Sequence, residues 1–398
     1  MKMKRLIAFL LSLVMVLAFA ACGSKDDAKP SDNAAGGDSD LSGQTILIGN
    51  ITPMTGAQAA YGTAITNSIQ MAIDEINEAG GILGATVELS SKDDQGTPAE
   101  AVSGFNALLS EDVTAIIGAC LSSCTSAITS LADDEGVVLI TPSSTADSIT
   151  TEDDYVFRSC FKDSFQGEMV AAYAAEQGWT KAAILYATGD TYSSGLRDSF
   201  EKAADQYDIE IVCEQSTSDT GAVDFSSQLA TIAASGADVL FAPYYYDAVG
   251  PKIIPQAREA GFTGAIMGCD GFDGTQDYTT GDLAAYENVF FTNHYSPEDP
   301  SETVQHYVTA YTDKYGSESL NALGALAYDA MYMLKQAIET AGSIDHDAIR
   351  DAMSGMHYVG VTGDMTLDES GTPEKSVAIM SFAQADGKLV QKFVTTQG

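Results

Sequence analysis

Positively charged residues are scarce in this chain of 398 residues. It holds 19 Lys and Arg against 56 Asp and Glu, which leaves a formal net charge of −37 at pH 7. A surface of this sign repels phosphate groups, so the folded part of the chain is a poor partner for nucleic acid and for anionic lipid surfaces. Tryptophan is rarer still, with one residue against 18 Tyr. Tyrosine combines an apolar ring with a hydroxyl that suits a wet binding pocket.

Signatures of catalysis are also missing. The sequence contains no G-x-S-x-G elbow, no G-x-x-x-x-G-K-[ST] phosphate loop, no H-E-x-x-H pair and no G-x-G-x-x-G after a predicted strand. Its four histidines all come late in the chain, at spacings that indicate no ligand cluster: His294, His306, His346 and His357. A histidine that is simply exposed or capped is the commoner case. We therefore predict a protein that is not an enzyme and that needs neither a cofactor nor a metal.

Cysteine occurs in a number that does not pair. Apart from Cys22, five cysteines remain, at positions 120, 124, 160, 213 and 269. An odd number outside the cytoplasm leaves at least one free thiol or a bridge between two chains. Of these alternatives, we expect buried and reduced thiols.

The apolar run at the amino terminus is too short to cross a bilayer. It covers the 16 residues 6–21, follows three basic residues and ends in small residues before Cys22. These are the parts of a secretory signal, and a cysteine at the cleavage point resembles the lipobox of bacterial lipoproteins. We predict that residues 1–21 form a lipoprotein signal peptide and that Cys22 carries the lipid. Residues 22–40 are small and polar, which predicts a flexible tether.

From residue 41 onward, short apolar runs alternate with segments of helical periodicity. Residues 45–48 have the pattern of a strand, and residues 62–79 place isoleucines at helical spacing. Such alternation predicts a parallel sheet that is covered by helices on both faces. A second series of the same kind begins after Arg158, and late strands are expected at 377–382 and 389–394. We therefore expect two α/β lobes.

Two of the predicted strands end in loops that are rich in hydroxyl groups. The apolar runs 115–117 and 137–140 are followed by Ser122 and by the turn Ser143 to Thr145. Because the carboxyl ends of parallel strands meet at one edge of a sheet, where ligands bind, we expect these hydroxyls to lie close together. They are uncharged donors suited to a small carboxylate. The alternative is that they only cap helices and form turns, as serine and threonine usually do.

Several short motifs occur along the chain, and their combination is specific to one family although each motif alone is weak. They are Ile48-Gly49, Thr52-Pro53, Tyr61-Gly62, residues 72–77 with Gly80-Gly81-Ile82, Asp93-Asp94, Ile117-Gly118, Ser122-Ser123, Ile140-Thr141-Pro142, Phe157-Arg158 and Asp224-Phe225-Ser226. Together they resemble the type I periplasmic binding proteins, specifically the leucine/isoleucine/valine-binding lipoproteins of amino-acid ABC transporters. The resemblance covers roughly residues 45–394.

This resemblance implies an α/β fold of two doubly wound parallel-sheet lobes joined by three hinge crossovers. The crossovers are expected near residues 158–161, 291–294 and 368–373. The first lobe then comprises residues 41–160 with 292–370, and the second comprises residues 161–291 with 371–398. Such proteins close their lobes over a ligand by bending at the crossovers.

The resemblance also assigns ligand contacts in the first lobe. Ser122 and the turn Ser143 to Thr145 match the groups that hold the carboxylate, and part of the ammonium, of an α-amino acid. Tyr61 matches an aromatic residue beside the ligand side chain. The alternative for Tyr61 is an aromatic residue that only lines the rim.

Three further contacts are assigned in the second lobe. Tyr192 and Tyr245 match pocket residues, and Asp270 matches an acidic residue that binds the ammonium. Burying an ammonium is costly unless it meets an opposite charge, which independently favours Asp270. The alternatives are a solvated turn aspartate at Asp270 and a rim position for Tyr192.

Tyr245 belongs to a run of three tyrosines, so its assignment carries an ambiguity of one position. One is expected in the cleft and two packed or exposed, because neighbours in a strand point in opposite directions.

The expected function is therefore that of an extracytoplasmic substrate-binding lipoprotein of an ABC importer, which captures a branched-chain or other apolar amino acid by hinge closure. The implied partners are the amino acid, the permease subunits and, through the lipid anchor, a bacterial cell membrane, with the protein itself a monomer. The alternatives are a sensor that reports to a membrane receptor, or a binder of a related small ligand such as an amide or urea.

Overall fold

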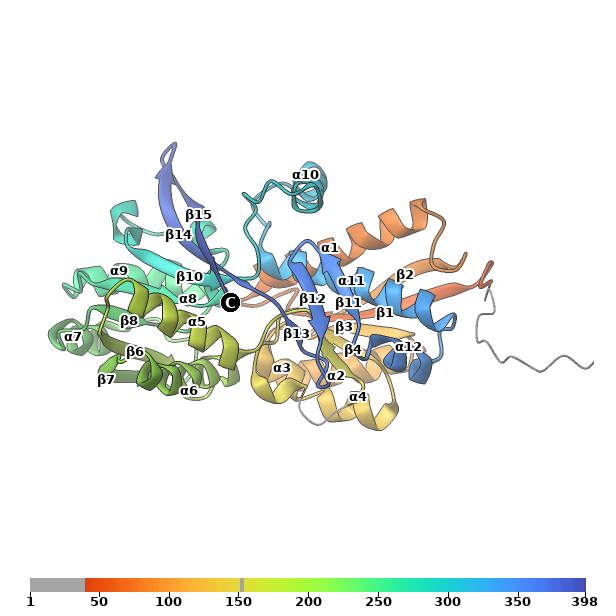
Figure 1. Ribbon diagram of the computed structural model, residues 1–398, viewed down its shortest axis with the longest axis horizontal. Coiled ribbons are helices and arrows are strands. Elements are labelled where there is room, and N and C mark those ends of the chain that lie inside the picture. The colour runs from red at the N-terminus through yellow and green to blue at the C-terminus, as the bar shows by residue number, and fades with distance from the viewer. Residues whose placement is uncertain (1–39, 151–153) are drawn as a thin grey trace, which may run out of the picture. The chain divides into compact units, whose positions relative to one another are not determined.

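The computed structural model describes residues 40–150 and 154–398. The predicted signal peptide, Cys22 and all but the last residue of the predicted tether lie outside the described residues. Within these two ranges, no helix is both long enough and apolar enough to cross a membrane. The described chain forms two α/β lobes, built on a five-stranded and a seven-stranded sheet (Figure 1).

The sheet of the first lobe is entirely parallel and has the strand order β2-β1-β3-β4-β5. Its strands are β1 (Thr45–Thr52), β2 (Thr86–Asp93), β3 (Ala115–Gly118), β4 (Leu139–Thr141) and β5 (Val156–Arg158). Every residue of β3 and β4 is buried, because a parallel sheet with helices on both faces leaves its central strands no contact with water.

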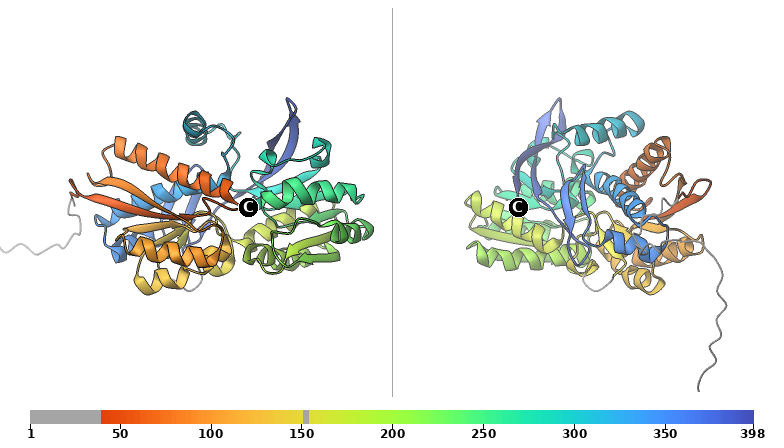
Figure 2. Two further views of the ribbon diagram at one scale, coloured as in Figure 1. Left: turned by 180° about the vertical axis from the view of Figure 1, so that it is seen from behind. Right: turned by 45° about the vertical axis from the view of Figure 1, so that its right-hand side comes forward.

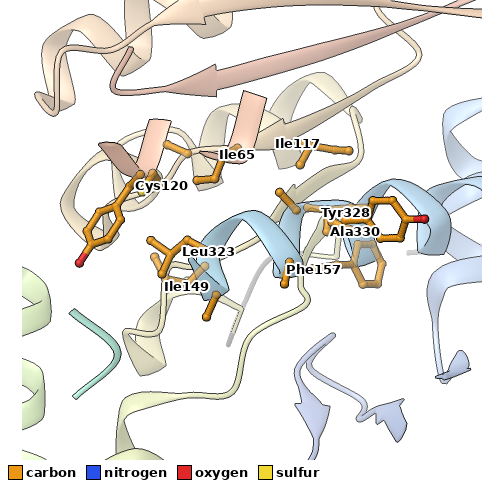
Figure 3. Close-up of a cluster of buried hydrophobic side chains, with 14 of the residues drawn as sticks. Ile65, Ile117, Cys120, Ile149, Phe157, Leu323, Tyr328 and Ala330 are labelled. Atoms are coloured by element: carbon orange, nitrogen blue, oxygen red, sulfur yellow. The ribbon is translucent and has the colours of Figure 1, made fainter. Parts of the chain in front are cut away.

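Helices from distant parts of the sequence cover this sheet. They are α1 (Ala59–Glu78), α2 (Pro98–Leu109), α3 (Ser122–Ser126), α4 (Thr129–Glu135) and α11 (Ala322–Ala341). Helices α1 and α11 pack against each other on one face, and α2 to α4 lie on the other (Figure 1). The isoleucines at helical spacing in α1 are all buried, as predicted. Figure 3 shows Leu323 of α11 in the same core as Ile65 of α1 and Ile117 of β3.

The sheet of the second lobe is mixed and has the strand order β15-β14-β10-β9-β8-β6-β7. Its strands are β6 (Lys181–Ala187), β7 (Glu210–Thr217), β8 (Val239–Phe241), β9 (Ala265–Gly268), β10 (Val289–Asn293), β14 (Val377–Ala385) and β15 (Lys388–Gln397). The predicted fold class is confirmed, with one difference: β14 runs antiparallel to both β10 and β15. Only Asp386 and Gly387 join β14 to β15, and both have a positive φ (51° and 75°), as a tight hairpin turn requires.

Helices again cover both faces of the second sheet (Figure 2). Helices α5 (Asp163–Glu176) and α6 (Thr191–Gln206) pack together, and α7 (Ser226–Ala234) packs with α9 (Ile254–Glu259). The helical segment that ends in α9 is irregular, because α8 (Tyr246–Ala248) runs into the π-helical turn η2 (Val249–Ile253) before α9 begins. Pro251 and Pro255 lack the N–H groups that a regular helix needs at these positions.

The chain passes between the lobes three times: from β5 into α5, from β10 into α10, and from β13 into β14. The segment between the second and third passages consists of α10 (Glu302–Tyr315), α11, α12 (His346–Met353), β11 (His357–Gly360), β12 (Gly363–Leu367) and β13 (Pro373–Glu374). Strands β11 to β13 form a small antiparallel sheet that the sequence patterns did not predict. The residue limits assigned to the two lobes stay a prediction.

Candidate functional site

The hydroxyl loops of the first lobe meet where β3 and β4 end. These strands are neighbours in the sheet, which places Ser122, the first residue of α3, beside the turn Ser143 to Thr145. The Ser143 hydroxyl donates to the Cys120 carbonyl oxygen (2.9 Å), and Ser122 Oγ accepts the Ala146 N–H (3.4 Å). No side chain caps α3, so Ser122 does not serve as a helix cap.

Arg158, the last residue of β5, fixes the backbone of this turn. Its side chain is completely buried, and burial lowers the pKa of the guanidinium. Its two terminal nitrogens donate to the carbonyl oxygens of Ser144 (3.3 Å), Thr145 (3.0 Å) and Ala146 (3.1 Å) and to the hydroxyl of Thr150 (2.9 Å). A planar guanidinium suits this arrangement because its donors form a rigid fork. The turn is therefore held by bonds made within the first lobe.

Asp270 lies in the second lobe, in the turn that follows β9. Its side chain is buried, with 3% of the residue exposed, so it is not a solvated turn aspartate. Its Oδ1 accepts hydrogen bonds from Tyr192 Oη (2.8 Å) and from Gln166 Nε2 (3.1 Å), and His294 Nε2 lies 3.2 Å from Oδ2. Among the described residues, no lysine or arginine forms an ion pair with this carboxylate.

Three tyrosines form the walls between Asp270 and the hydroxyl loops. The ring of Tyr192 stacks on that of Tyr245 (centroids 5.0 Å apart, planes at 17°), and Tyr61 meets Tyr245 edge to face (6.5 Å, 77°). Six of the seven predicted ligand residues line one small cavity with four others: Tyr61, Cys120, Leu121, Ser122, Ser143, Tyr192, Tyr245, Asp270, Gly271 and Leu323. Its volume is about 10 Å³, which is room for roughly one water molecule.

Thr145 is the predicted residue that does not line this cavity. It is fully buried, and its hydroxyl has no hydrogen-bond partner among the described residues. Its carbonyl oxygen accepts from Arg158 and from the Asp163 N–H (2.8 Å). Thr145 therefore contributes to the shape of the turn through its backbone, and a direct role in ligand binding stays a prediction.

The sequence patterns missed two polar partners of Asp270. Gln166 comes from α5, and it both donates to Asp270 Oδ1 and accepts the Asp270 N–H (3.0 Å). His294 departs from the commoner case of an exposed or capped histidine, because its imidazole is buried and stacks on Phe161 (centroids 3.8 Å apart, planes at 23°). These residues stand 104 and 24 positions from Asp270, so only the fold brings them together.

Direct contacts join the lobes at the edge of the cavity. Tyr61 Oη donates to the Gly271 carbonyl oxygen (2.8 Å), Tyr246 Oη donates to the Ala57 carbonyl oxygen (2.9 Å), and Gln58 Nε2 donates to Asp247 Oδ1 (3.0 Å). Each of these bonds runs from one lobe to the other. They can exist only when the lobes are closed against each other.

The three consecutive tyrosines at positions 244–246 lie in three different environments. Tyr245 lines the cavity, Tyr246 reaches across to the first lobe, and Tyr244 packs in the hydrophobic core of the second lobe, with its hydroxyl 2.7 Å from Thr217 Oγ1. One tyrosine lies in the cleft and two pack elsewhere, as expected, but strand alternation is not the reason, because the run follows the end of β8 at Phe241.

Neither a metal cluster nor a disulfide is found within the described ranges. No group of three or more His, Cys, Asp or Glu side chains there is arranged to hold a metal ion. All five cysteines after Cys22 carry free thiols, and Cys213 is the one that is partly exposed. Burial raises the pKa of the Cys120 thiol well above its usual range, so this side chain presents a neutral surface to the cavity.

Two α/β lobes, linked by three crossings and holding a small cavity between them, define a bilobal ligand-binding protein. The family profile described as "Periplasmic binding protein" matches residues 45–388. The chain belongs to the type I periplasmic binding proteins, in the Leu/Ile/Val-binding family of ABC-transporter components. This is a family of binding proteins and not of enzymes.

Individual relatives resemble the chain over most of its length. The Leu/Ile/Val-binding protein BraC3 of Rhizobium johnstonii is 30% identical over 332 residues, which cover 82% of this chain and 88% of BraC3. The crystal structure of the leucine-binding protein LivK from Thermotoga maritima has a TM-score of 0.80 at 32% identity, covering 88% of this chain and 98% of LivK. The branched-chain amino acid binding protein LivJ from Streptococcus pneumoniae, in complex with isoleucine, has a TM-score of 0.79 at 32% identity, covering 88% and 99%.

Proposed function

We propose that this protein is the extracytoplasmic substrate-binding component of an ABC importer and that it captures an α-amino acid with an apolar side chain. The observation that carries the proposal is the buried carboxylate of Asp270, with which no lysine or arginine in the described part of the chain pairs and which faces hydroxyl groups of the other lobe across one cavity. A buried charge is costly unless an opposite charge meets it. The ammonium of an amino acid supplies that charge.

The hydroxyl loops offer contacts for the carboxylate of the ligand and for part of its ammonium. A hydroxyl has one proton to donate and two lone pairs to accept with. Ser122 Oγ accepts the Ala146 N–H, so its own proton is free to be donated to a carboxylate. Ser143 donates to the Cys120 carbonyl oxygen, which leaves its oxygen free to accept from the ammonium.

The remaining walls of the cavity favour an apolar side chain. Leu121, Leu323 and the neutral thiol of Cys120 stand beside the tyrosine rings. A pocket with these walls gains free energy from burying aliphatic surface, at roughly 25 cal/mol per Å². The relatives named for leucine, isoleucine and valine agree with this preference.

Binding requires the lobes to part. A cavity of about 10 Å³ cannot admit an amino acid, which is several times the size of a water molecule. The hydrogen bonds between the lobes must therefore break, and the tyrosine rings must move, before the ligand enters. The lobes then close again over the ligand, with the tyrosine rings displaced from their positions in this structure.

Calorimetric titration with matched ligands tests the proposal. Leucine, isoleucine and valine are compared with leucine amide, which lacks the carboxylate, with 4-methylpentanoate, which lacks the ammonium, and with benzoate and urea. We expect leucine to bind roughly 100-fold or more tightly than 4-methylpentanoate, because a buried carboxylate would otherwise stay unpaired. Equal affinity for these two compounds would contradict the recognition of an amino acid, and tight binding of urea or leucine amide would favour the alternative ligands.

The contact between Gln58 and Asp247 is expected to tune affinity without selecting the ligand. Gln58→Ala removes a bond that exists only in the closed form, so it should weaken closure by about 0.5–1.5 kcal/mol and raise Kd roughly 2- to 10-fold for every ligand alike. Gln70→Ala is the matched control, because Gln70 donates to Asp74 within the same helix of one lobe (2.8 Å). A change that differs between leucine and valine would mean that Gln58 contacts the ligand.

Attachment to the membrane through Cys22 belongs to the same proposal. It is supported by the basic, apolar and small-residue segments that precede Cys22 in the sequence. Cys22→Ser should abolish acylation and release the protein from membranes, since each buried CH₂ of an acyl chain contributes about 0.8 kcal/mol. Intact-mass analysis of membrane-extracted parent protein measures the added lipid, and an unmodified mass would contradict the anchor.

The genes that lie beside this one distinguish a role in uptake from a role in sensing. Permease and ATPase genes beside this one would favour uptake, whereas a lone gene beside a kinase would favour the alternative of a sensor.

A further inference from the structure

His294 connects the candidate ligand site to two of the passages between the lobes. It directly follows β10, on the second passage, and its ring stacks on Phe161, which lies on the first. Its backbone N–H donates to Asn293 Oδ1, and its Nε2 lies 3.2 Å from Asp270 Oδ2. A flat ring held between a neighbouring ring and a carboxylate has little freedom to turn.

The bonds that Asp270 already makes define where a ligand can reach it. An ionised carboxylate has about four lone-pair sites. Tyr192 and Gln166 occupy two of them on Oδ1, and His294 occupies one on Oδ2. The remaining site is on Oδ2, next to the imidazole. A ligand ammonium that pairs with Asp270 must therefore lie beside His294.

We propose that His294 is a positioning residue for the amino-acid ammonium: its neutral ring donates Nε2–H to Asp270 Oδ2 and aims the free lone pair at the ligand, and its protonation expels the ligand. This inference rests on the proposed function, because it assumes an ammonium at Asp270. It adds a residue that neither the sequence patterns nor the family resemblance assigned to the site.

The surroundings of the imidazole support a neutral ring at physiological pH. Burial lowers the pKa of His294, and the positive charge of Lys375 lowers it further, whereas the bond to Asp270 and its negative charge act in the opposite direction. The titratable and charged groups around this cluster are Asp270, Lys375, Cys160, Cys269, Tyr192 and Asp163. Burial raises the pKa of both thiols and of Tyr192, so these three groups stay neutral.

The sign of the pH dependence follows from the charge of the ligand. Below the pKa of His294 the empty site takes up a proton, and the new positive charge opposes the ammonium. The bound form resists this protonation, because the ammonium already stands beside the ring. Affinity for the amino acid must therefore fall as the pH falls, with a limiting slope of about tenfold per pH unit for a single proton.

Two variants of His294 separate positioning from mere packing. His294→Gln keeps an amide N–H that can reach Oδ2 but cannot titrate, and His294→Leu removes the donor. Because the pKa of His294 is lowered by burial, we expect the parent protein to lose leucine affinity only as the pH falls below about 6.5, the ordinary value for histidine. His294→Gln should bind within about fivefold of the parent at pH 8 and have a flatter pH profile. His294→Leu should bind at least tenfold more weakly at pH 8. A His294→Gln variant with the parent slope, or a His294→Leu variant with the parent affinity, would overturn the inference.

Asp163 provides the control for a second titrating group. Burial raises the pKa of its carboxyl well above the usual range, so it too can change charge as the pH falls. Asp163→Asn should keep the parent slope, since His294 remains. Loss of the slope in Asp163→Asn would assign the effect to Asp163 and count against His294.

A measurement without ligand keeps this inference distinct from the proposed function. In ¹⁵N-histidine-labelled protein, His294 should show the Nε2–H tautomer, and its resonances should shift in Asp270→Asn. If the parent protein bound no amino acid, the proposed function would fail, while these resonances would still decide whether His294 holds Asp270. An Nδ1–H tautomer, or resonances that ignore Asp270→Asn, would overturn the contact itself.

Discussion

Asp270→Ala is expected to weaken amino-acid binding by about 3–5 kcal/mol, or roughly two to four orders of magnitude in Kd. The variant leaves the ligand ammonium in a closed cavity with no opposite charge, and it leaves the donors of Tyr192 and Gln166 without their acceptor. Both losses act on the closed, desolvated state, where charge pairs contribute most. Titration calorimetry with leucine measures the effect.

Asp270→Asn distinguishes the charge from the shape of the side chain. The amide fills the same volume and keeps one oxygen acceptor, so it should fold as the parent does and still lose most of the affinity. Thermal unfolding of both variants without ligand controls for damage to the fold. If Asp270→Asn bound leucine as tightly as the parent, the ammonium would not pair with position 270.

Arg158→Met is expected to lower the free energy of unfolding by about 3–5 kcal/mol. The guanidinium holds three consecutive carbonyl oxygens, those of Ser144, Thr145 and Ala146, and methionine offers no donor to replace it. Each of these carbonyl oxygens keeps one other donor, from Cys160, Asp163 and Ile149 respectively. The variant therefore loses hydrogen bonds to a charged group, which contribute roughly 1.5–3 kcal/mol each before the desolvation of the guanidinium is subtracted. Because the same turn carries Ser143, the variant should also bind leucine more weakly.

Arg197→Met is the matched control for this experiment. Arg197 pairs with Asp198, Glu201 and Glu214 near the surface, where its side chain is 22% exposed. Ion pairs in contact with water contribute little, so this variant should change the free energy of unfolding by no more than about 1 kcal/mol. Urea unfolding followed by circular dichroism compares the two. Equal effects of both substitutions would mean that the bonds of Arg158 to the turn do not stabilise the fold.

Much of the fold was predictable because its signals are local. Short apolar runs that alternate with helical periodicity indicated parallel sheets, and the buried strands β3 and β4 agree with this. The antiparallel course of β14 and β15 was missed, although Asp386-Gly387 between two strand-like runs is itself a hairpin signal. The small sheet of β11 to β13 was missed because its strands are only four, five and two residues long, which is too short for their alternating burial to stand out in the sequence.

The candidate site, like the fold, was predictable only where its signals are local in the sequence. The meeting of Ser122 with Ser143 follows from neighbouring strands, so spacing alone predicted it. Gln166 and His294 reach Asp270 from separate elements, and nothing in the residues around them marks a polar partner. The sequence around His294 also gave no sign that its ring is buried, whereas the fold stacks it on Phe161. Contacts between distant positions depend on tertiary structure, which a single sequence does not display.

The three adjacent tyrosines give this protein separable routes of evolutionary change. Tyr244 belongs to the core of the second lobe, Tyr245 to the cavity and Tyr246 to the contact with the first lobe. A mutation at one of these positions therefore acts mainly on folding, on ligand choice or on the balance between open and closed forms. Under the proposed function, a change of ligand can arise at position 245 while the neighbouring positions keep stability and closure. An insertion or deletion within the run would exchange all three roles at once, so the spacing of these residues matters as well as their identity.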